Sequence, residues 1–114
     1  MNMKSKQRNK TEARNSVSVA FTSEGWEDYC HWKDADSDVF ATINTLIREC
    51  LRTPFKGTGK PEPLKGDLSG FWSRRITREH RLVYLFEGGQ MTILQCRYNY
   101  DDKSRRSNPY GIAP

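Results

Sequence analysis

The chain of 114 residues is poor in histidine, cysteine and long apolar runs. No hydrophobic run approaches the ~20 residues that a helix needs to cross a bilayer, and the basic N-terminus lacks the apolar segment of a secretory signal. The three cysteines are isolated, odd in number and without CxxC spacing, and the two histidines lie far apart. These absences argue against a membrane span, a disulfide framework and a metal site, and they fit a reducing cytoplasm.

Several motifs of common enzymes are also missing. The sequence contains no Walker loop, no dinucleotide-binding glycine pattern and no GxSxG. Each of these motifs places backbone amides or a nucleophile where a cofactor or substrate needs them. We therefore expect no cofactor.

The hydrophobic share of 35% is low for a globular protein, and much of the deficit lies at the two ends. Residues 1–15 contain no large apolar residue except methionine, and residues 102–114 are nearly as polar. We therefore expect a disordered basic arm over 1–15, one folded domain over 16–101 and a polar tail over 102–114. Both ends should be dispensable for the fold.

The N-terminal part of that domain shows a strand followed by two helices. The alternating, valine-rich stretch 16–21 predicts a short strand. Thr22 or Ser23 can cap a helix over "SEGWEDYCHW", and this helix should stop near "DADSD". Asp36 or Ser37 can cap a second, clearly amphipathic helix, which Pro54 ends.

The C-terminal half predicts a long loop and an antiparallel meander. Residues 53–70 hold four glycines and three prolines, which is typical of a loop with stiff pieces. Strands follow over 71–76 and 81–86, and a last strand runs to the end of "MTILQCRYNY". Gly88-Gly89 between two apolar runs indicates a tight hairpin. The expected fold class is α+β, with both helices packed on one face of the sheet.

The hairpin sets a predicted register. If Gly88 and Gly89 form the loop, Glu87 faces Gln90 and Arg81 faces Cys96. One face then carries Arg81, Val83, Leu85, Leu94, Cys96, Tyr98 and Tyr100, and the other carries Leu82, Tyr84, Phe86, Met91, Ile93 and Arg97. Asn99 and Tyr100 would point to opposite faces unless the strand ends or bulges near Tyr98.

The basic residues of the C-terminal half suggest an RNA-binding surface. The formal net charge is +5, which favours polyanions, and nucleic acid is the commonest polyanion. Guanidinium groups neutralise phosphates while rings stack on splayed bases. A strand with a solvated basic face and a buried aromatic face explains Trp72 and Tyr84 equally well, but it explains Arg81 poorly. We assign RNA or phosphate contacts to Lys65, Arg74, Arg75 and Arg97, with aromatic neighbours at Phe71, Trp72, Tyr84, Tyr98 and Tyr100.

Long stretches of the sequence resemble one toxin family. "TPFKGTGKPEPLKGDLSGFWSRRITREHRLVY", "CRYNY" and the helical "SEGWEDYCHW" closely resemble the YoeB toxins of the RelE/ParE superfamily, from about residue 17 to residue 100. The resemblance implies a RelE-like microbial RNase fold and a metal-independent endoribonuclease that cuts mRNA at the ribosomal A site and inhibits translation. It also implies a cognate YefM-like antitoxin and a homodimer.

The same resemblance implies a set of site residues. Glu62 in "KPEPLK" corresponds to the general base, Arg81 in "EHRLVY" to the phosphate-binding arginine, and Lys65 to a second phosphate contact. Asn99 and Tyr100 correspond to the final His-Tyr pair of the family, so an amide stands where a general-acid imidazole is expected. Asn99 can donate a hydrogen bond but cannot protonate an alkoxide leaving group.

Two questions stay open at the level of sequence. Asn99 is either an engineered replacement that removes toxicity or a natural residue, with His80 or Tyr100 supplying the proton or with a weaker enzyme as the result. The function is either endoribonuclease or occupancy of the ribosome or a DNA-linked target by a catalytically weak binding toxin, as in ParE-like relatives. The pair Glu62 and Arg81 distinguishes the two functions.

Overall fold

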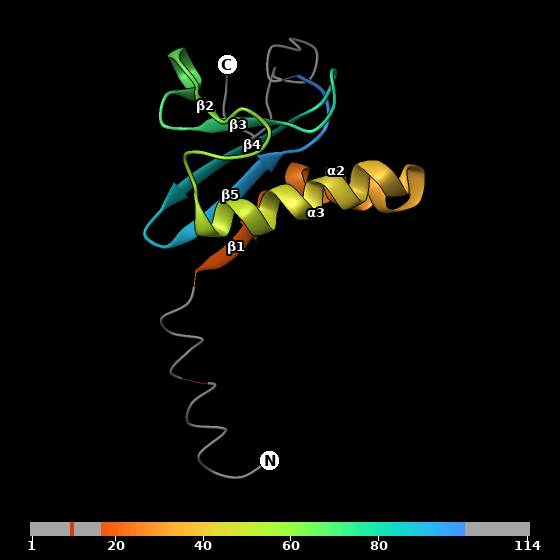
Figure 1. The fold of residues 1–114 in the computed structure, drawn as a ribbon, viewed down its shortest axis with the longest axis horizontal. Coiled ribbons are helices and arrows are strands. Elements are labelled where there is room, and N and C mark those ends of the chain that lie inside the picture. The colour runs from red at the N-terminus through yellow and green to blue at the C-terminus, as the bar shows by residue number, and fades with distance from the viewer. Residues whose placement is uncertain (1–9, 11–16, 100–114) are drawn as a thin grey trace.

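A computed structural model describes Lys10 and residues 17–99. The predicted arm, apart from Lys10, the predicted tail and the candidate residue Tyr100 lie outside the described residues. The elements follow one another as β1 (Ser18–Phe21), α2 (Ser23–Ala35), α3 (Ser37–Arg52), β2 (Glu62–Pro63), the 3-10 helix η1 (Gly66–Leu68), β3 (Trp72–Arg75), β4 (Arg81–Glu87) and β5 (Gln90–Gln95) (Figure 1).

Both helices begin at the predicted caps. The Thr22 hydroxyl accepts a hydrogen bond from the backbone N–H of Gly25 at 3.0 Å, which satisfies one of the orphan donors at the start of α2. The Asp36 carboxylate accepts from the N–H groups of Asp38 and Val39 at 3.0 and 3.2 Å. Helix α3 ends at Arg52, before Pro54, because the residue preceding a proline avoids helical angles.

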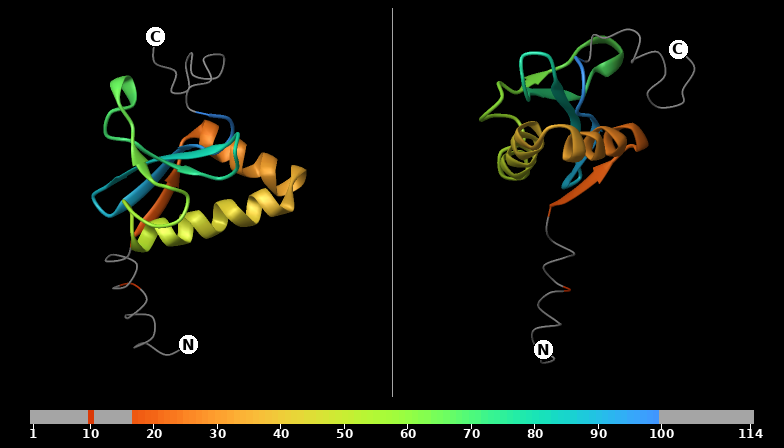
Figure 2. Two further views of the ribbon diagram at one scale, coloured as in Figure 1. Left: turned by 45° about the horizontal axis from the view of Figure 1, so that its top comes forward. Right: turned by 90° about the vertical axis from the view of Figure 1, so that its right-hand side faces the viewer.

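The strands form one sheet in the order β1-β5-β4-β3-β2, and the helices cover one of its faces (Figures 1 and 2). The neighbouring pairs β2–β3, β3–β4 and β4–β5 are antiparallel, whereas β1 pairs with β5 in parallel, so the sheet is mixed. The predicted α+β class is confirmed. The two-residue strand β2 inside the predicted loop was not foreseen.

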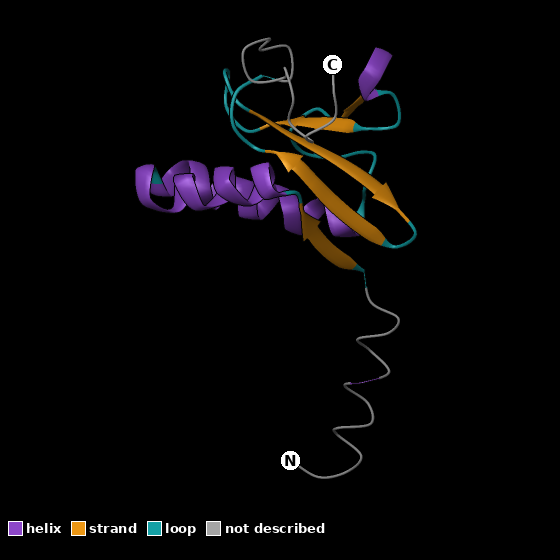
Figure 3. Ribbon diagram, turned by 180° about the vertical axis from the view of Figure 1, so that it is seen from behind, coloured by secondary structure: helices purple, strands orange, loops and turns teal. Residues whose placement is uncertain are grey.

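The last strand is shorter and less regular than the sequence predicts. The pairing of Glu87 with Gln90 is confirmed, but Val83 pairs with Gln95 while Tyr84 pairs with Ile93. This bulge inserts one residue into β5 and shifts its alternation. The predicted pairing of Arg81 with Cys96 is therefore wrong, and so is the extension of the strand to residue 100 (Figure 3).

The apolar residues form two clusters on opposite faces of the sheet, and the bulge turns Cys96 to the helix side. The main core lies between the helices and the sheet and includes Cys96, which the predicted register assigns to the opposite face. Its buried members are Trp32, Ile43, Leu46, Cys50, Ile76, Leu82, Tyr84, Met91, Ile93 and Cys96. A smaller cluster on the helix-free face consists of Leu64, Val83 and Leu94, with Leu68 and Phe71 packed against it. The segment that carries β2 and η1 therefore covers part of the second face.

Helix α2 approaches β5 so closely that it tolerates no side chain at Gly25. A Cβ built at Gly25 would lie 2.5 Å from the backbone carbonyl oxygen of Ile93. We predict that Gly25→Ala lowers the free energy of unfolding by about 1–3 kcal/mol, because overpacking outweighs the better helix propensity of alanine. Urea unfolding measures this. Thr45→Ala on the exposed face of α3 is the control and should change stability by less than about 0.5 kcal/mol. Equal stability of Gly25→Ala and wild type would contradict the close approach.

Candidate active site

Three of the candidate residues share the helix-free face of the sheet. Glu62 pairs with Ser73 across β2 and β3, and Arg75 pairs with Arg81 across β3 and β4. Ser73 and Arg75 lie two residues apart on β3, so their side chains point to the same face. Directly paired residues also share a face, which brings Glu62, Arg75 and Arg81 to one side. Neighbouring strands are about 4.8 Å apart and residues of a strand about 3.3 Å apart, so the backbones of Glu62 and Arg81 are separated by about 10 Å across the sheet and about 7 Å along it.

Glu62 is held in an extended conformation at the edge of the sheet. It lies in the exposed strand β2 between Pro61 and Pro63, whose rings restrict the backbone. The chain is fixed directly after it, where the N–H of Leu64 donates to the carbonyl of Phe71 at 2.9 Å and Leu64 packs into the small cluster. The sequence thus places a carboxylate on a stiff backbone beside the basic residues.

Arg81 is oriented by the turn that precedes it. Its Nη1 donates to the carbonyl oxygens of Thr77, Arg78 and His80 at 2.8, 3.1 and 3.1 Å. Anchoring one end of a planar guanidinium fixes the direction of the whole fork. The Nε and Nη2 groups carry three further N–H bonds, a donor set suited to phosphate oxygens.

Two side chains of helix α2 form hydrogen bonds with the backbone of Cys96, directly after the end of β5. The buried carboxylate of Asp28 accepts from the N–H of Cys96 at 3.0 Å, and the indole N–H of Trp32 donates to the carbonyl of Cys96 at 2.8 Å. These two side chains replace the ladder partners that Cys96 has lost beyond the bulge. Sequence analysis missed both roles. The indole N–H of Trp32 and the acidic side chain of Asp28 were visible signals, but their partner lies more than 60 residues away.

A second set of contacts turns the chain toward Arg81. Tyr98 adopts a left-handed conformation with φ of 66°, its N–H donates to Nδ1 of His80 at 2.7 Å, and its carbonyl accepts from the N–H of Arg81 at 3.1 Å. Asn99, the last described residue, follows directly. The strand therefore ends before Tyr98, which is one of the two conditions under which Asn99 and Tyr100 can line one site.

His80 lies on the helix side of the sheet, as its position before Arg81 predicts. Its ring packs edge-on against Trp32 with centroids 4.8 Å apart, and Nδ1 accepts the hydrogen bond from Tyr98. Burial lowers the pKa of His80 from its ordinary value of 6.5; the charge of Glu79 opposes this shift and the charge of Arg97 adds to it, both by smaller amounts. This placement argues against His80 as the proton donor in cleavage. Its observed contact fixes the chain just before Asn99.

The other predicted RNA-binding residues differ in their exposure to solvent. The assignment of Arg74 to RNA binding is wrong, because its side chain is fully buried on the helix side and donates to protein carbonyls. Lys65 and Arg75 are exposed, and Arg97 is half-buried with its guanidinium 4.8 Å from the centre of the Tyr98 ring. Tyr100 lies outside the described residues.

Within residues 10 and 17–99, no group of three or more His, Cys, Asp and Glu side chains could hold a metal ion. In the same part of the chain, none of the helices has the length and apolar character needed to cross a membrane.

Solved structures of toxins share this architecture. The YoeB/ParE toxin from Agrobacterium tumefaciens superimposes with a TM-score of 0.72 at 49% identity, covering 74% of this chain and 100% of that chain. The toxin in a heterotetrameric YoeB-YefM complex from Staphylococcus aureus gives a TM-score of 0.69 at 38% identity, with 74% and 98% coverage. The fold is thus that of a YoeB/ParE-type toxin.

Sequence comparison then narrows the class to one family. Residues 21–100 match the profile of the YoeB-like toxin of bacterial type II toxin-antitoxin systems. Toxin YoeB of Streptomyces coelicolor is 60% identical over 82 residues, which cover 72% of this chain and 98% of that protein. The chain belongs to the YoeB-like family and is a toxin of a type II toxin–antitoxin system.

The burial of His80 makes stability depend on pH. The pKa of His80 is below 6.5 in the folded protein, so the unfolded chain takes up the proton first as the pH falls. The stability contributed by the neutral ring is therefore present above pH 6.5 and is lost as the pH falls through the lower folded pKa. We predict that the wild type loses more free energy of unfolding than His80→Gln between pH 8 and pH about 5, measured by urea unfolding. Parallel curves for the two proteins would refute this contribution.

Proposed function

We propose that this toxin is a metal-independent endoribonuclease that cleaves mRNA on the ribosome. The observation that carries the proposal is the shared face of Glu62, Arg75 and Arg81, at the end of the sheet where the chain reaches Asn99. A carboxylate and two guanidinium groups on one face provide a base and phosphate-binding cations. Family membership supports the same conclusion.

The proposed reaction is an internal transfer within the RNA backbone. Glu62 accepts the proton of a 2′-OH, whose oxygen forms a bond to the adjacent phosphorus while the bond from phosphorus to the 5′-oxygen breaks. Arg81, with Arg75 and Lys65, stabilises the extra negative charge on the phosphorane. Asn99 donates a hydrogen bond near the leaving 5′-oxygen, which takes its proton from Tyr100 or from a water molecule. The products are a 2′,3′-cyclic phosphate and a 5′-hydroxyl.

The proposed partners follow from charge and from the relatives. The toxin of Staphylococcus aureus was solved in a heterotetrameric complex with YefM, and we propose a YefM-like antitoxin for this chain. An acidic, disordered antitoxin segment would be attracted by the net charge of +5 and would order on binding. We also propose a homodimer, the cytoplasm as the location, and the A site of the ribosome as the place of cleavage.

The first test separates cleavage from occupancy. We predict that Glu62→Gln slows single-turnover cleavage of mRNA on programmed ribosomes by about 10²–10⁴-fold, because the base is lost while phosphate contacts remain. Arg81→Ala should slow cleavage and also weaken binding. Primer extension maps the mRNA ends. Toxicity that survives both changes together, with no new ends, would support the occupancy function instead.

The second test concerns the amide at position 99. We predict that Asn99→His raises the cleavage rate by about 10²–10⁴-fold with little change in ribosome affinity, because it adds a proton donor but no phosphate contact. The gain should fall at high pH, where imidazole loses its acid form. Asn99→Gln is the matched control, since it changes the side chain without adding an acid. A folded, ribosome-binding Asn99→His protein with no gain would place Asn99 outside the site.

A further inference from the structure

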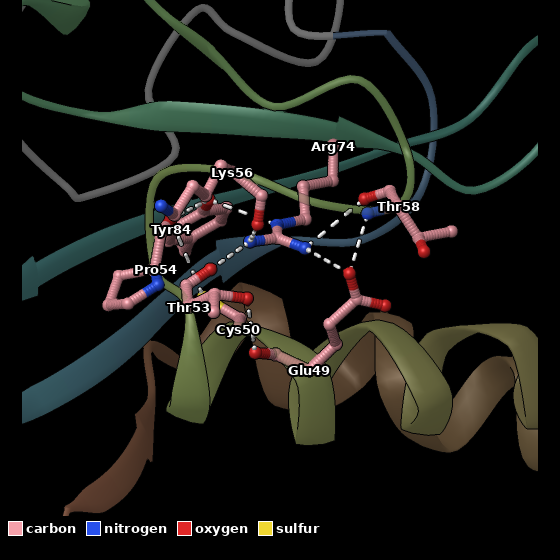
Figure 4. Close-up of polar contacts among 8 residues, drawn as sticks. All are labelled: Glu49, Cys50, Thr53, Pro54, Lys56, Thr58, Arg74 and Tyr84. Atoms are coloured by element: carbon pink, nitrogen blue, oxygen red, sulfur yellow. Dashed lines mark hydrogen bonds and ion pairs between the residues drawn. The ribbon is translucent and has the colours of Figure 1, made fainter.

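Arg74 is buried in a cage made by the segment that follows helix α3 (Figure 4). Its Nη2 donates to the carbonyl oxygens of Thr53 and Lys56 at 2.5 and 3.0 Å, and its Nη1 donates to that of Thr58 at 3.1 Å. Its Nε donates to the hydroxyl of Tyr84 at 3.2 Å. Burying a guanidinium is unfavourable unless its donors are satisfied, and here most of the acceptors belong to one loop.

The partners of Arg74 are themselves fixed. Burial raises the pKa of Tyr84 to about 12, so its phenol stays protonated and donates to the carbonyl of Pro54 at 2.6 Å. Glu49 accepts from the N–H of Thr58 at 2.6 Å and lies 3.8 Å from Nη1 of Arg74. The hydrogen bonds from Thr58 lower the pKa of Glu49, so its carboxylate stays charged at neutral pH. The guanidinium is thus the centre of a closed network.

The loop has no regular secondary structure of its own, although Phe55 packs against Trp72 with ring centroids 4.8 Å apart. Between Thr53 and Glu62 it contains two prolines and two glycines, and the residues between Arg52 and Glu62 belong to no helix or strand. Gly59 has φ of 85° and lies so close to β3 that an added Cβ would be 3.1 Å from both the carbonyl of Arg75 and the Cβ of Arg74. The N–H of Arg75 donates to the carbonyl of Gly59 at 2.7 Å. The loop therefore packs closely against β3 and surrounds the side chain of Arg74.

This loop leads directly to Glu62. The carboxylate lies three positions beyond Gly59, and its strand partner Ser73 is the residue before Arg74. Strand β2 has only two residues, and Pro63 offers no backbone donor to the ladder. Leu64 fixes the chain after Glu62, and the loop held by Arg74 fixes the chain before it, so the position of Glu62 along the sheet edge depends in part on Arg74.

We propose that Arg74 is a positioning residue for cleavage, which holds loop 53–61 so that the carboxylate of Glu62 reaches the 2′-OH. The proposal rests on Glu62 acting as the base, as proposed above. Arg74 touches no RNA in this role, because it lies on the helix side of the sheet. A positioning residue alters the rate of the chemical step and leaves affinity nearly unchanged.

Arg74→Lys is the principal variant. A lysine ammonium keeps the charge but is a compact group with three donors, so it cannot span the carbonyls of Thr53, Lys56 and Thr58 together with the Tyr84 hydroxyl. We expect single-turnover cleavage on programmed ribosomes to slow by about 10²-fold, a loss typical of a small misplacement of a catalytic group. The Kd for ribosomes and its salt dependence should stay within about 2-fold of wild type. Arg75→Ala provides the contrast, since it should weaken binding and reduce the salt dependence.

A double-mutant cycle with Glu62→Gln tests whether Arg74 acts through Glu62. In the Glu62→Gln background, Arg74→Lys should slow cleavage by less than about 3-fold, because there is no base left to position. Equal losses in both backgrounds would overturn the proposal. If Arg74 is merely structural, the cleavage rate of folded Arg74→Lys should equal that of the wild type. Ile43→Val in the main core controls for the effect of lost stability on the rate. If Glu62→Gln alone leaves cleavage unchanged, Glu62 is not the base and the proposed function fails. The cycle thus distinguishes this outcome from a failure of the positioning role of Arg74.

Glu49→Ala is a milder variant in case Arg74→Lys does not fold. It removes the acceptor of the Thr58 N–H and one neighbour of Arg74 at a partly exposed position of α3. We expect about a 10-fold slower cleavage with unchanged Kd, and faster amide hydrogen exchange over residues 57–62. An unchanged rate together with faster exchange would show that the loop can move without moving Glu62, which overturns the proposal.

Discussion

Side chains alternate between the two faces of a β-strand, and on β3 this alternation separates two neighbouring arginines. Arg74 points toward the helices, where it is fully buried, whereas Arg75 is exposed on the opposite face beside Arg81. One strand therefore supplies both a cation for the loop and a cation for the candidate site. A shift of β3 by one residue would exchange the faces to which these two arginines point.

The other end of the site depends on a local break in regularity. The bulge opposite Val83 and the left-handed Tyr98 remove the last part of β5 from the ladder. Unpaired backbone groups in a protein interior are costly, and Asp28, Trp32 and His80 satisfy those that the break exposes. Helix α2 thereby stabilises the segment that carries Asn99, although none of its residues lies on the helix-free face.

Local patterns in the sequence were sufficient for most of the fold. Side-chain caps at Thr22 and Asp36, the turn at Gly88-Gly89 and the amphipathic period of α3 each act within a few residues, so their outcome is visible in the sequence. The bulge was not visible, because the contacts that hold the chain beyond it join Cys96 to side chains of α2 that are distant in sequence. Family resemblance supplied Glu62 and Arg81, and the sheet register then brought them to one face.

Arg74 shows why the number of basic residues was not sufficient to predict which of them bind RNA. From sequence, consecutive arginines near aromatic residues form a basic patch, and only the strand period could have separated them. That period does not reveal whether an inward-pointing arginine finds acceptors, because the acceptors are carbonyls of a loop without regular structure. A glycine- and proline-rich loop cannot satisfy these carbonyls by itself, and a buried arginine cannot stay without them. The loop carbonyls and the guanidinium of Arg74 satisfy each other. These hydrogen bonds explain how an irregular loop can hold the carboxylate of Glu62 at a fixed place on the sheet edge.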